Sequence, residues 1–257
     1  MTRPVFHAEA AVLGAARPGE DITLRGDEAR HAATVRRLRP GEEVDVVDGA
    51  GRRVTGTVVA AERDGLTVSV TAVVDEPRPA PRLVLVQALA KGGRDEQAVE
   101  AATELGVDAV VPWQADRSVS VWTGKPERAA KGRRRWEAVT TAAGKQSRRA
   151  SFPAVRDLVT TAGLRTAVAG TVAGGGTVLV LHEAATTSLT TVALPQREAD
   201  TEVVVVVGPE GGITDEELAA LGDAGAQVVR AGPHVMRSST AGPAALGVLA
   251  SRTGRWE

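Results

Sequence analysis

The stretch that decides the fold is residues 203–218, VVVVVGPEGGITDEEL. Five consecutive β-branched residues followed by turn-forming residues are typical of a strand buried on both faces, as in a parallel sheet. Thr214 is a favourable N-cap and Glu217, three positions later, completes a capping box, so a helix is predicted to begin here. Residues 208–212 are therefore predicted to form a loop at the carboxyl end of a buried strand, where open α/β sheets bind ligands.

A second unit of the same kind follows at residues 227–240, QVVRAGPHVMRSST. Its pattern predicts a short strand, a loop rich in Gly and Pro, and an Ala- and Leu-rich helix from Ser238 to about Ala250. Two loops of this kind within thirty residues predict one site that is built from both.

The remaining chain divides at a Pro-rich segment, residues 75–82, which is typical of a stiff linker. From residue 83 onward, apolar strands (83–89, 109–111, 177–181) alternate with helical segments (95–105, 127–143, 155–162), which predicts an α/β domain with a parallel sheet. Residues 1–74 instead contain short β-type runs (21–24, 43–47, 53–59, 66–73) around one helix, residues 27–38. They predict a small, mostly antiparallel β-barrel or sandwich. The expected domains are therefore 1–74 and 83–257.

Composition excludes several classes of function. The absence of cysteine excludes disulfides, thiolate metal sites and a cysteine nucleophile, and four scattered histidines disfavour structural zinc, so we expect no metal. No run reaches the roughly 18 apolar residues of a membrane span, and the first residues lack the apolar segment of a signal peptide. We therefore expect a cytoplasmic protein without a membrane partner.

Charge is unevenly distributed although the net charge is only −1. Between Arg117 and Arg149, ten Lys and Arg residues, Lys125 among them, face two acidic residues. Such a stripe is typical of nucleic acid binding, and the alternative is a solvated helix face. Phosphate contacts position RNA without specifying sequence. The candidates, with those of the N-terminal helix, are Arg30, His31, Arg36, Arg37, Arg117, Arg133, Arg134, Arg135, Arg148 and Arg149.

The loop at residues 208–212 matches none of the common nucleotide motifs. The chain has no Walker A sequence, no Gly-x-Gly-x-x-Gly after a first strand and no Gly-x-Ser-x-Gly elbow. Glycines let the backbone approach a ligand closely, so a pocket lined by backbone groups is predicted, which suits a purine-like ligand. The alternative is a plain turn from strand to helix.

Both loops resemble the C-terminal signature of the SPOUT methyltransferases, the trefoil-knotted class. More narrowly, they are similar to the bacterial 16S rRNA uracil-N3 methyltransferase family, which has Gly-Pro-Glu-Gly-Gly and then Gly-Pro-x-x-Leu-Arg-x-x-Thr-Ala. Here these are residues 208–212 and 232–241, with further matches at 104–107, 117–118 and 146–149 and in the N-terminal segment 31–42. The chain departs from the family's usual residues at Ala101, Ile213, His234, Met236 and Ser239.

The resemblance implies a fold and an activity. The fold is an α/β domain with a trefoil knot and a parallel sheet, preceded by a PUA-like β-barrel that binds RNA. The activity is methylation of uridine N3 in the 16S rRNA of the small ribosomal subunit, with S-adenosylmethionine as cofactor, by a homodimer formed through the knot. Two alternatives are a SPOUT methyltransferase that acts on another rRNA or tRNA position, and a non-catalytic RNA-binding protein of ribosome assembly.

The resemblance also assigns residues, because backbone groups of three loops hold the cofactor in this family. The corresponding residues here are Leu181, His182, Glu183, Gly208, Pro209, Glu210, Gly211, Gly212, Ala231, Gly232, Pro233, Val235, Met236, Ser239 and Thr240. Methylation of an imide nitrogen needs positioning and a positive group beside the developing negative charge. We predict that Arg237 supplies this group, and the alternative is a structural salt bridge. Glu210 is predicted to orient the substrate, to act as base or to balance the sulfonium charge, and the alternative is a carboxylate bound to its own loop.

Overall fold

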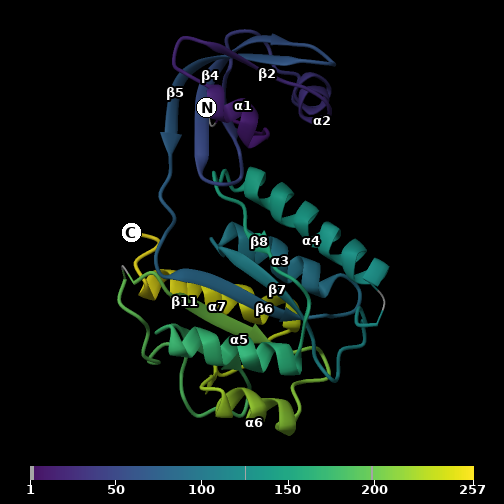
Figure 1. The fold of residues 1–257 in the computed structure, drawn as a ribbon, viewed down its shortest axis with the longest axis vertical. Coiled ribbons are helices and arrows are strands. Elements are labelled where there is room, and N and C mark those ends of the chain that lie inside the picture. The colour runs from purple at the N-terminus through teal and green to yellow at the C-terminus, as the bar shows by residue number, and fades with distance from the viewer. Residues whose placement is uncertain (1–2, 125, 198) are drawn as a thin grey trace. The chain divides into compact units, whose positions relative to one another are not determined.

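A computed structural model describes residues 3–124, 126–197 and 199–257 (Figure 1). Lys125, counted above in the basic stripe, lies outside the described residues. The chain forms two compact units, one made of Met1–Arg78 with Gly144–Phe152 and the other of Pro79–Ala143 with Pro153–Glu257. The first unit thus includes a segment from the middle of the chain in addition to the residues before the Pro-rich segment.

The first unit is a five-stranded sheet in the order β1-β3-β4-β5-β2. Its strands are β1 (Val5–His7), β2 (Asp21–Leu24), β3 (Glu43–Val47), β4 (Arg52–Ala61) and β5 (Leu66–Asp75). Strand β1 pairs in parallel with β3, and the other pairs are antiparallel. The inward-facing side chains of these five strands, among them Phe6, form one apolar core together with Leu13. The mostly antiparallel N-terminal domain is therefore confirmed.

Short helices accompany this sheet: α1 (Ala10–Ala15), α2 (Asp27–Arg30) and a π-helix, η1 (His31–Arg36). The expected helix 27–38 is thus divided, and it ends earlier because Arg37 adopts a left-handed conformation, with φ of 52°. At the end of η1, the side chains of Val35, Arg36 and Arg37 are all exposed.

The segment Gly144–Phe152 packs onto this sheet. The Lys145 ammonium forms an ion pair with Glu28, and Gly51 N donates to Ala150 O at 3.2 Å. The rings of His7 and Phe152 lie 5.4 Å apart. This part of the basic stripe therefore belongs to the same unit as α2 and η1.

The second unit contains a sheet in the order β12-β10-β11-β6-β7-β8, with β9 also pairing with β7. All pairs are parallel, as the sequence predicts. The strands are β6 (Arg82–Ala88), β7 (Ala109–Gln114), β8 (Ala154–Val155), β9 (Val159–Thr160), β10 (Thr177–Leu181), β11 (Glu202–Val207) and β12 (Gln227–Val229).

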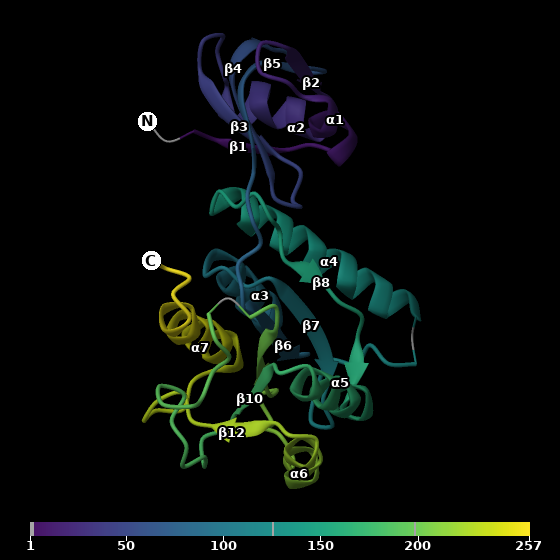
Figure 2. The same ribbon diagram turned by 60° about the vertical axis from the view of Figure 1, so that its left-hand side comes forward.

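Helices cover both faces of this sheet (Figure 2). Leu83 and Leu85 of β6 share one core with α3 (Arg94–Glu104), α4 (Pro126–Gln146) and α7 (Ser238–Arg252). Val84 and Val86 face the opposite side, where they pack with α5 (Thr161–Ala173) and α6 (Asp215–Asp223). The central strands are therefore buried on both faces, which explains their continuous apolar sequences.

One expectation was wrong: residues 155–162 are not a helix. They contain β8 and β9, which pair with β7 through Ala109 and Ala154 and through Trp113 and Val159, and α5 begins only at Thr161. Parallel pairing with a buried neighbour overrides the weak local helical pattern.

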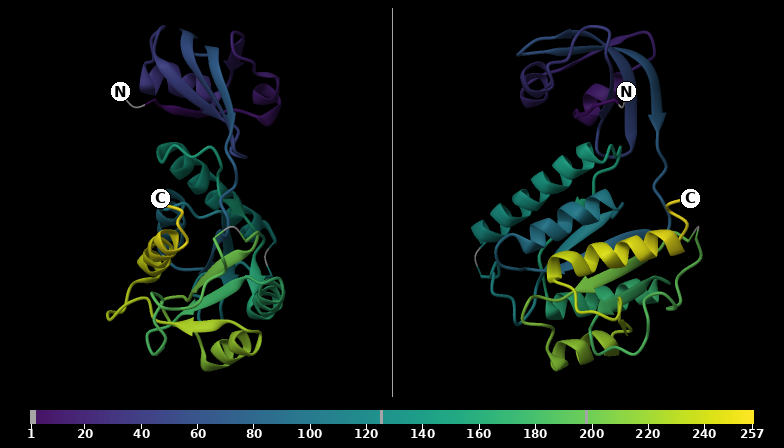
Figure 3. Two further views of the ribbon diagram at one scale, coloured as in Figure 1. Left: turned by 90° about the vertical axis from the view of Figure 1, so that its left-hand side faces the viewer. Right: turned by 180° about the vertical axis from the view of Figure 1, so that it is seen from behind.

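The C-terminal helix contacts the loop that joins β10 to β11. From α7, the Arg252 guanidinium donates to the carbonyls of Leu189 and Val192 at 2.8 and 2.7 Å. Both of those loop residues are buried in the same core as α7. Helix α7 lies against one face of the sheet (Figure 3), and its last turn holds this loop.

A glycine lets α7 approach the sheet closely. A Cβ on Gly242 would lie 2.8 Å from Leu85 Cδ1 and 3.3 Å from Val207 Cγ2, which is too close for any larger residue without a shift of the helix.

Candidate active site

The carboxyl ends of β10, β11 and β12 lie side by side, and the loops that follow them line two hollows. The smaller, about 150 Å³, is lined by Leu181–Glu183, by residues 230–236 and by Ala241. The larger, about 770 Å³, is lined by Leu181–Glu183, by residues 207–213 and 235–238, and by Arg94, Arg117, Asp215 and Ala241. The two share six lining residues and are therefore continuous. The two loops thus lie next to each other, and that they build one site remains a prediction.

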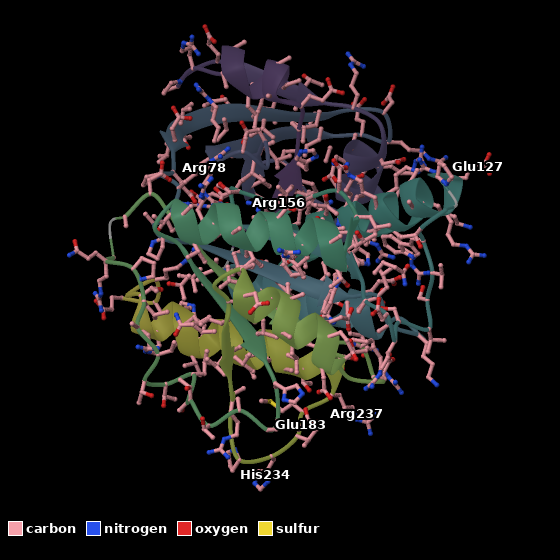
Figure 4. The ribbon with its side chains drawn as sticks, turned by 60° about the horizontal axis from the view of Figure 1, so that its bottom comes forward. Arg78, Glu127, Arg156, Glu183, His234 and Arg237 are labelled. Atoms are coloured by element: carbon pink, nitrogen blue, oxygen red, sulfur yellow. The ribbon has the colours of Figure 1, made fainter. Side chains whose placement is uncertain are left out.

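Figure 4 shows Glu183 and Arg237 at the same end of this unit, with His234 further out on its loop. His234 lines only the smaller hollow. Val235 lines both hollows, yet it is 80% exposed. A large exposed apolar side chain inside a concave site is a surface that a ligand covers.

Backbone groups of the loop after β12 are available to a ligand. Among the described residues, no N–H group from Ala231 to Arg237 donates to another backbone carbonyl. A purine offers donors and acceptors that match such backbone groups. The smaller hollow is therefore bordered by backbone N–H groups of the loop after β12, whereas the sequence predicts a backbone-lined pocket at residues 208–212, which border the larger hollow.

The Gly-rich loop after β11 is shaped by its glycines and by the capping box. Gly212 has φ of 77° and its N–H donates to Pro209 O at 2.9 Å. A Cβ on Gly211 would lie 3.0 Å from Arg117 Cβ. The Arg117 guanidinium donates to Gly211 O at 3.1 Å. A side chain at position 211 would therefore disturb this contact.

Glu210 is held by groups at the start of α3. Its carboxylate accepts from Arg94 Nη1 at 2.9 Å and from Lys91 N at 3.3 Å. Burial opposes ionisation of this carboxyl, but hydrogen bonds from its own amide, Arg94 and Lys91 prevail and lower its pKa. Glu210 is thus a carboxylate at neutral pH whose Oε1 accepts both of these bonds.

Glu217 joins three segments around the larger hollow. Its side chain is part of a residue only 2% exposed and completes the predicted capping box with Thr214. The same carboxylate accepts from Asp116 N at 3.0 Å and from Thr161 Oγ1 at 2.7 Å. It therefore ties the segment that carries Arg117 to the beginnings of α5 and α6.

Most of the predicted cofactor residues line the two hollows, and two do not. Ser239 and Thr240 line neither hollow. Their neighbours do: Ser238 lines the larger hollow and Ala241 lines both. Thr240 Oγ1 donates to Arg237 O at 3.1 Å and so belongs to the start of α7. Arg237 itself lines the larger hollow, is exposed and has no ion pair within the described part of the chain.

The predicted RNA-binding residues fall into several groups. Arg117 lines the larger hollow. Arg133 pairs with Glu137 and Asp157, and Arg135 pairs with Glu96 at 2.7 Å. The exposed members are Arg36, Arg37, Arg134 and Arg148, and Arg148 has φ of 60°. Arg30 forms an ion pair with Asp27, and the ring centroids of His31 and Phe6 lie 6.1 Å apart. The backbone N–H of Arg149 donates to Gly144 O.

Sequence reasoning missed Arg94, Asp215 and Ser238, which line the larger hollow, and the bonds by which Glu217 holds neighbouring segments together. A usable signal existed for Arg94, because it follows Gly92 and Gly93 a few residues after the buried strand β6 ends at Ala88. Glycines at the carboxyl end of a buried strand are the same signal that identified residues 208–212.

Comparisons with known proteins agree with this geometry. Residues 24–71 match a family described as RNA methyltransferase PUA domain, and residues 76–250 match one described as RNA methyltransferase domain. Proteins named ribosomal RNA small subunit methyltransferase E, from Mycobacterium bovis and Mycobacterium tuberculosis, are each 48% identical over 93% of this chain and 89% of their own. The chain belongs to the ribosomal RNA small subunit methyltransferase E family.

A solved structure of this family supports the same assignment. The Neisseria gonorrhoeae member, bound to S-adenosyl methionine, is 25% identical, covers 98% of both chains and has a TM-score of 0.83. A methyltransferase from Legionella pneumophila, 24% identical with a TM-score of 0.82 over 98% of both chains, shares the fold. The predicted family and the knotted α/β fold with its PUA-like domain are confirmed.

The described residues contain neither a metal-binding cluster nor a membrane-spanning helix. In the described ranges, no group of three or more His, Asp or Glu side chains is arranged to hold a metal ion. No helix of the described chain is both long and apolar enough to cross a membrane.

Proposed function

We propose that this chain uses S-adenosylmethionine to methylate N3 of a uridine in the 16S rRNA of the small ribosomal subunit. The observation that carries the proposal is the continuous pair of hollows at the ends of β10, β11 and β12. One hollow is lined by free backbone N–H groups and the other by three arginines, which suits a nucleoside cofactor beside an anionic RNA substrate.

The residues present fit this cofactor. Leu181, Val235 and Met236 provide apolar walls to the smaller hollow, and the loop from Ala231 offers unpaired N–H groups to an adenine ring. The small side chain of Ala241 lines both hollows and leaves room where they join. The bound cofactor supplies an electrophilic methyl group on a positively charged sulfur.

The chain's own groups would prepare the methyl acceptor. A uracil imide nitrogen becomes nucleophilic when its proton leaves to solvent, and negative charge then spreads to the flanking carbonyl oxygens. Arg237, permanently charged and without an ion pair in the described chain, is placed to stabilise that charge. The lowered pKa of Glu210 and its contacts with Arg94 favour a role in orientation and charge balance over a role as base.

We also propose how the rest of the chain serves this reaction. The N-terminal unit, with Arg36, Arg37 and Arg148 exposed, would bind rRNA phosphates, and its contribution would weaken with salt. Helix α7 carries no charged side chain from Ser238 to Ser251, and Ala244 on it is exposed. A second copy of the chain would pack on this helix to form a homodimer through the knot.

The test is methylation of small ribosomal subunits and of naked 16S rRNA from a strain that lacks the enzyme, with a radiolabelled methyl donor. Methylation at N3 removes a Watson–Crick donor, so the position is mapped by arrest of reverse transcription and confirmed by mass spectrometry of nucleosides. N3-methyluridine in 16S rRNA is the expected product. Label at another atom or in tRNA would identify a different methyltransferase, and cofactor binding without any label would favour the non-catalytic alternative.

A further inference from the structure

Ser238 lines the larger hollow, but no role has been given to its side chain above. Its residue is only 9% exposed, and its hydroxyl oxygen is buried without a hydrogen-bond partner among the described residues. The same residue lines the larger hollow and not the smaller one. Buried polar atoms are nearly always paired, so an unpaired hydroxyl in the wall of a binding site indicates a partner that the ligand supplies.

Ser238 is also the first residue of α7, a helix of fifteen residues. The N-cap residue, Arg237, makes no side-chain capping bond. The N–H groups of Ser238 and Ser239 precede the first intrahelical bonds, and the helix dipole adds positive potential at this end. The hydroxyl therefore lies where a negatively charged oxygen is favoured.

The charged groups around this position support the same preference. Arg94 is engaged by Glu210, and Arg117 donates to a backbone carbonyl. The remaining titratable lining groups are His182, Glu183, Asp215 and Arg237. Arg237 is adjacent to Ser238 in sequence and, in the described chain, forms no ion pair, so its charge is available to the same ligand oxygen.

We propose that Ser238 is a catalytic hydrogen-bond donor to the target base. Its hydroxyl would bind a carbonyl oxygen beside N3 of the uracil and stabilise the anion formed when the N3 proton leaves to solvent. The inference rests on the proposed function, because it assumes that a uracil imide is the methyl acceptor. The carboxylate of the cofactor offers similar chemistry, and the experiment separates the two.

The experiment compares Ser238→Ala with Ser238→Thr, which keeps the hydroxyl, and with Thr166→Ala, which removes an exposed hydroxyl from α5 on the other face of the sheet. For each protein, kcat is measured against pH at saturating cofactor with 16S rRNA as substrate. The affinity for S-adenosylhomocysteine is measured by calorimetry, and the melting temperature is recorded.

Ser238→Ala should lower kcat at neutral pH on the order of 100-fold, as does loss of one donor to a developing oxyanion. The rising limb of its pH profile should move to higher pH by about one unit for each tenfold loss in anion stabilisation. Affinity for S-adenosylhomocysteine should not change, and the melting temperature should stay equal or rise because no intramolecular bond is lost. Ser238→Thr should restore the wild-type profile, and Thr166→Ala should match wild type.

Two results would overturn the inference while the proposed function stands. Weaker binding of S-adenosylhomocysteine with an unmoved pH profile would place the hydroxyl on the cofactor carboxylate. Unchanged kcat, profile and affinity would make the hydroxyl irrelevant to the reaction. If wild type forms no N3-methyluridine, the proposed function fails and this inference fails with it, so the wild-type assay tells the two failures apart.

Discussion

Replacing Glu217 by alanine should lower the free energy of unfolding of the second unit by much more than its position in a surface helix suggests. The carboxylate accepts from Asp116 N, Thr214 N and Thr161 Oγ1, and the residue is 2% exposed. Each buried N–H group left without an acceptor costs about 1–3 kcal/mol. The two backbone groups together give about 2–6 kcal/mol, and we expect a loss of about 4 kcal/mol.

The assay is urea unfolding followed by tryptophan fluorescence, because Trp113 is fully buried and its Nε1 donates to Thr161 Oγ1. Glu216→Ala is the matched control, since it removes an exposed carboxylate from the same helical turn. The control should cost only about 0.3–1 kcal/mol, from the helix dipole. The loss in free energy of unfolding for Glu217→Gln should lie between these two values. The glutamine keeps one acceptor oxygen, but its NH₂ group faces a backbone N–H and cannot accept from it.

The reasoning would be refuted if Glu217→Ala cost less than about 1 kcal/mol, or no more than Glu216→Ala, with an unchanged m-value. Such a result would mean that water satisfies these N–H groups once the side chain is removed, and that the carboxylate does not hold the three segments together.

Three further predictions concern stability and RNA binding. Arg255→Ala should destabilise the second unit by about 1.5–3 kcal/mol in urea unfolding, because the partly buried Asp108 carboxylate loses its ion pair and keeps only its bond from Leu83 N, and a loss below about 0.5 kcal/mol would contradict this. Burial raises the pKa of the Asp95 carboxyl, so its ionisation opposes folding. The free energy of unfolding of Asp95→Asn should therefore exceed that of wild type at pH 7 and equal it near about pH 2. Equal free energies at both pH values would count against the effect of burial. Arg36→Ala with Arg37→Ala should reduce the slope of log K for rRNA against log salt by roughly 0.7–0.9 per lost phosphate contact, and an unchanged slope would remove these residues from the interface.

The parts of this structure that the sequence predicts depend on local signals. The five valines of β11 and the Thr214–Glu217 capping box are such signals, and both were predicted correctly. The same is true of the two Gly-rich loops, because the Gly and Pro residues that form a turn stand next to the buried strand in the sequence.

Long-range contacts explain what could not be predicted. Glu217 bonds to Asp116 and Thr161, which are 101 and 56 positions away. Residues 155–162 failed as a helix because their pairing partner is β7, far upstream. The role of Gly144–Phe152 in the N-terminal unit has the same cause, since no local pattern marks a segment that packs on a distant sheet.

If the loops after β11 and β12 form one cofactor site, calorimetric titration with S-adenosylmethionine will show it. Wild type and Gly211→Val are compared, because a Cβ at position 211 would meet Arg117 Cβ at 3.0 Å. Gly222→Val, whose Cβ would meet nothing within 4 Å, is the control. We expect wild type and the control to bind S-adenosylmethionine and Gly211→Val to lose binding. Absence of binding to wild type, or unchanged binding in Gly211→Val, would contradict it.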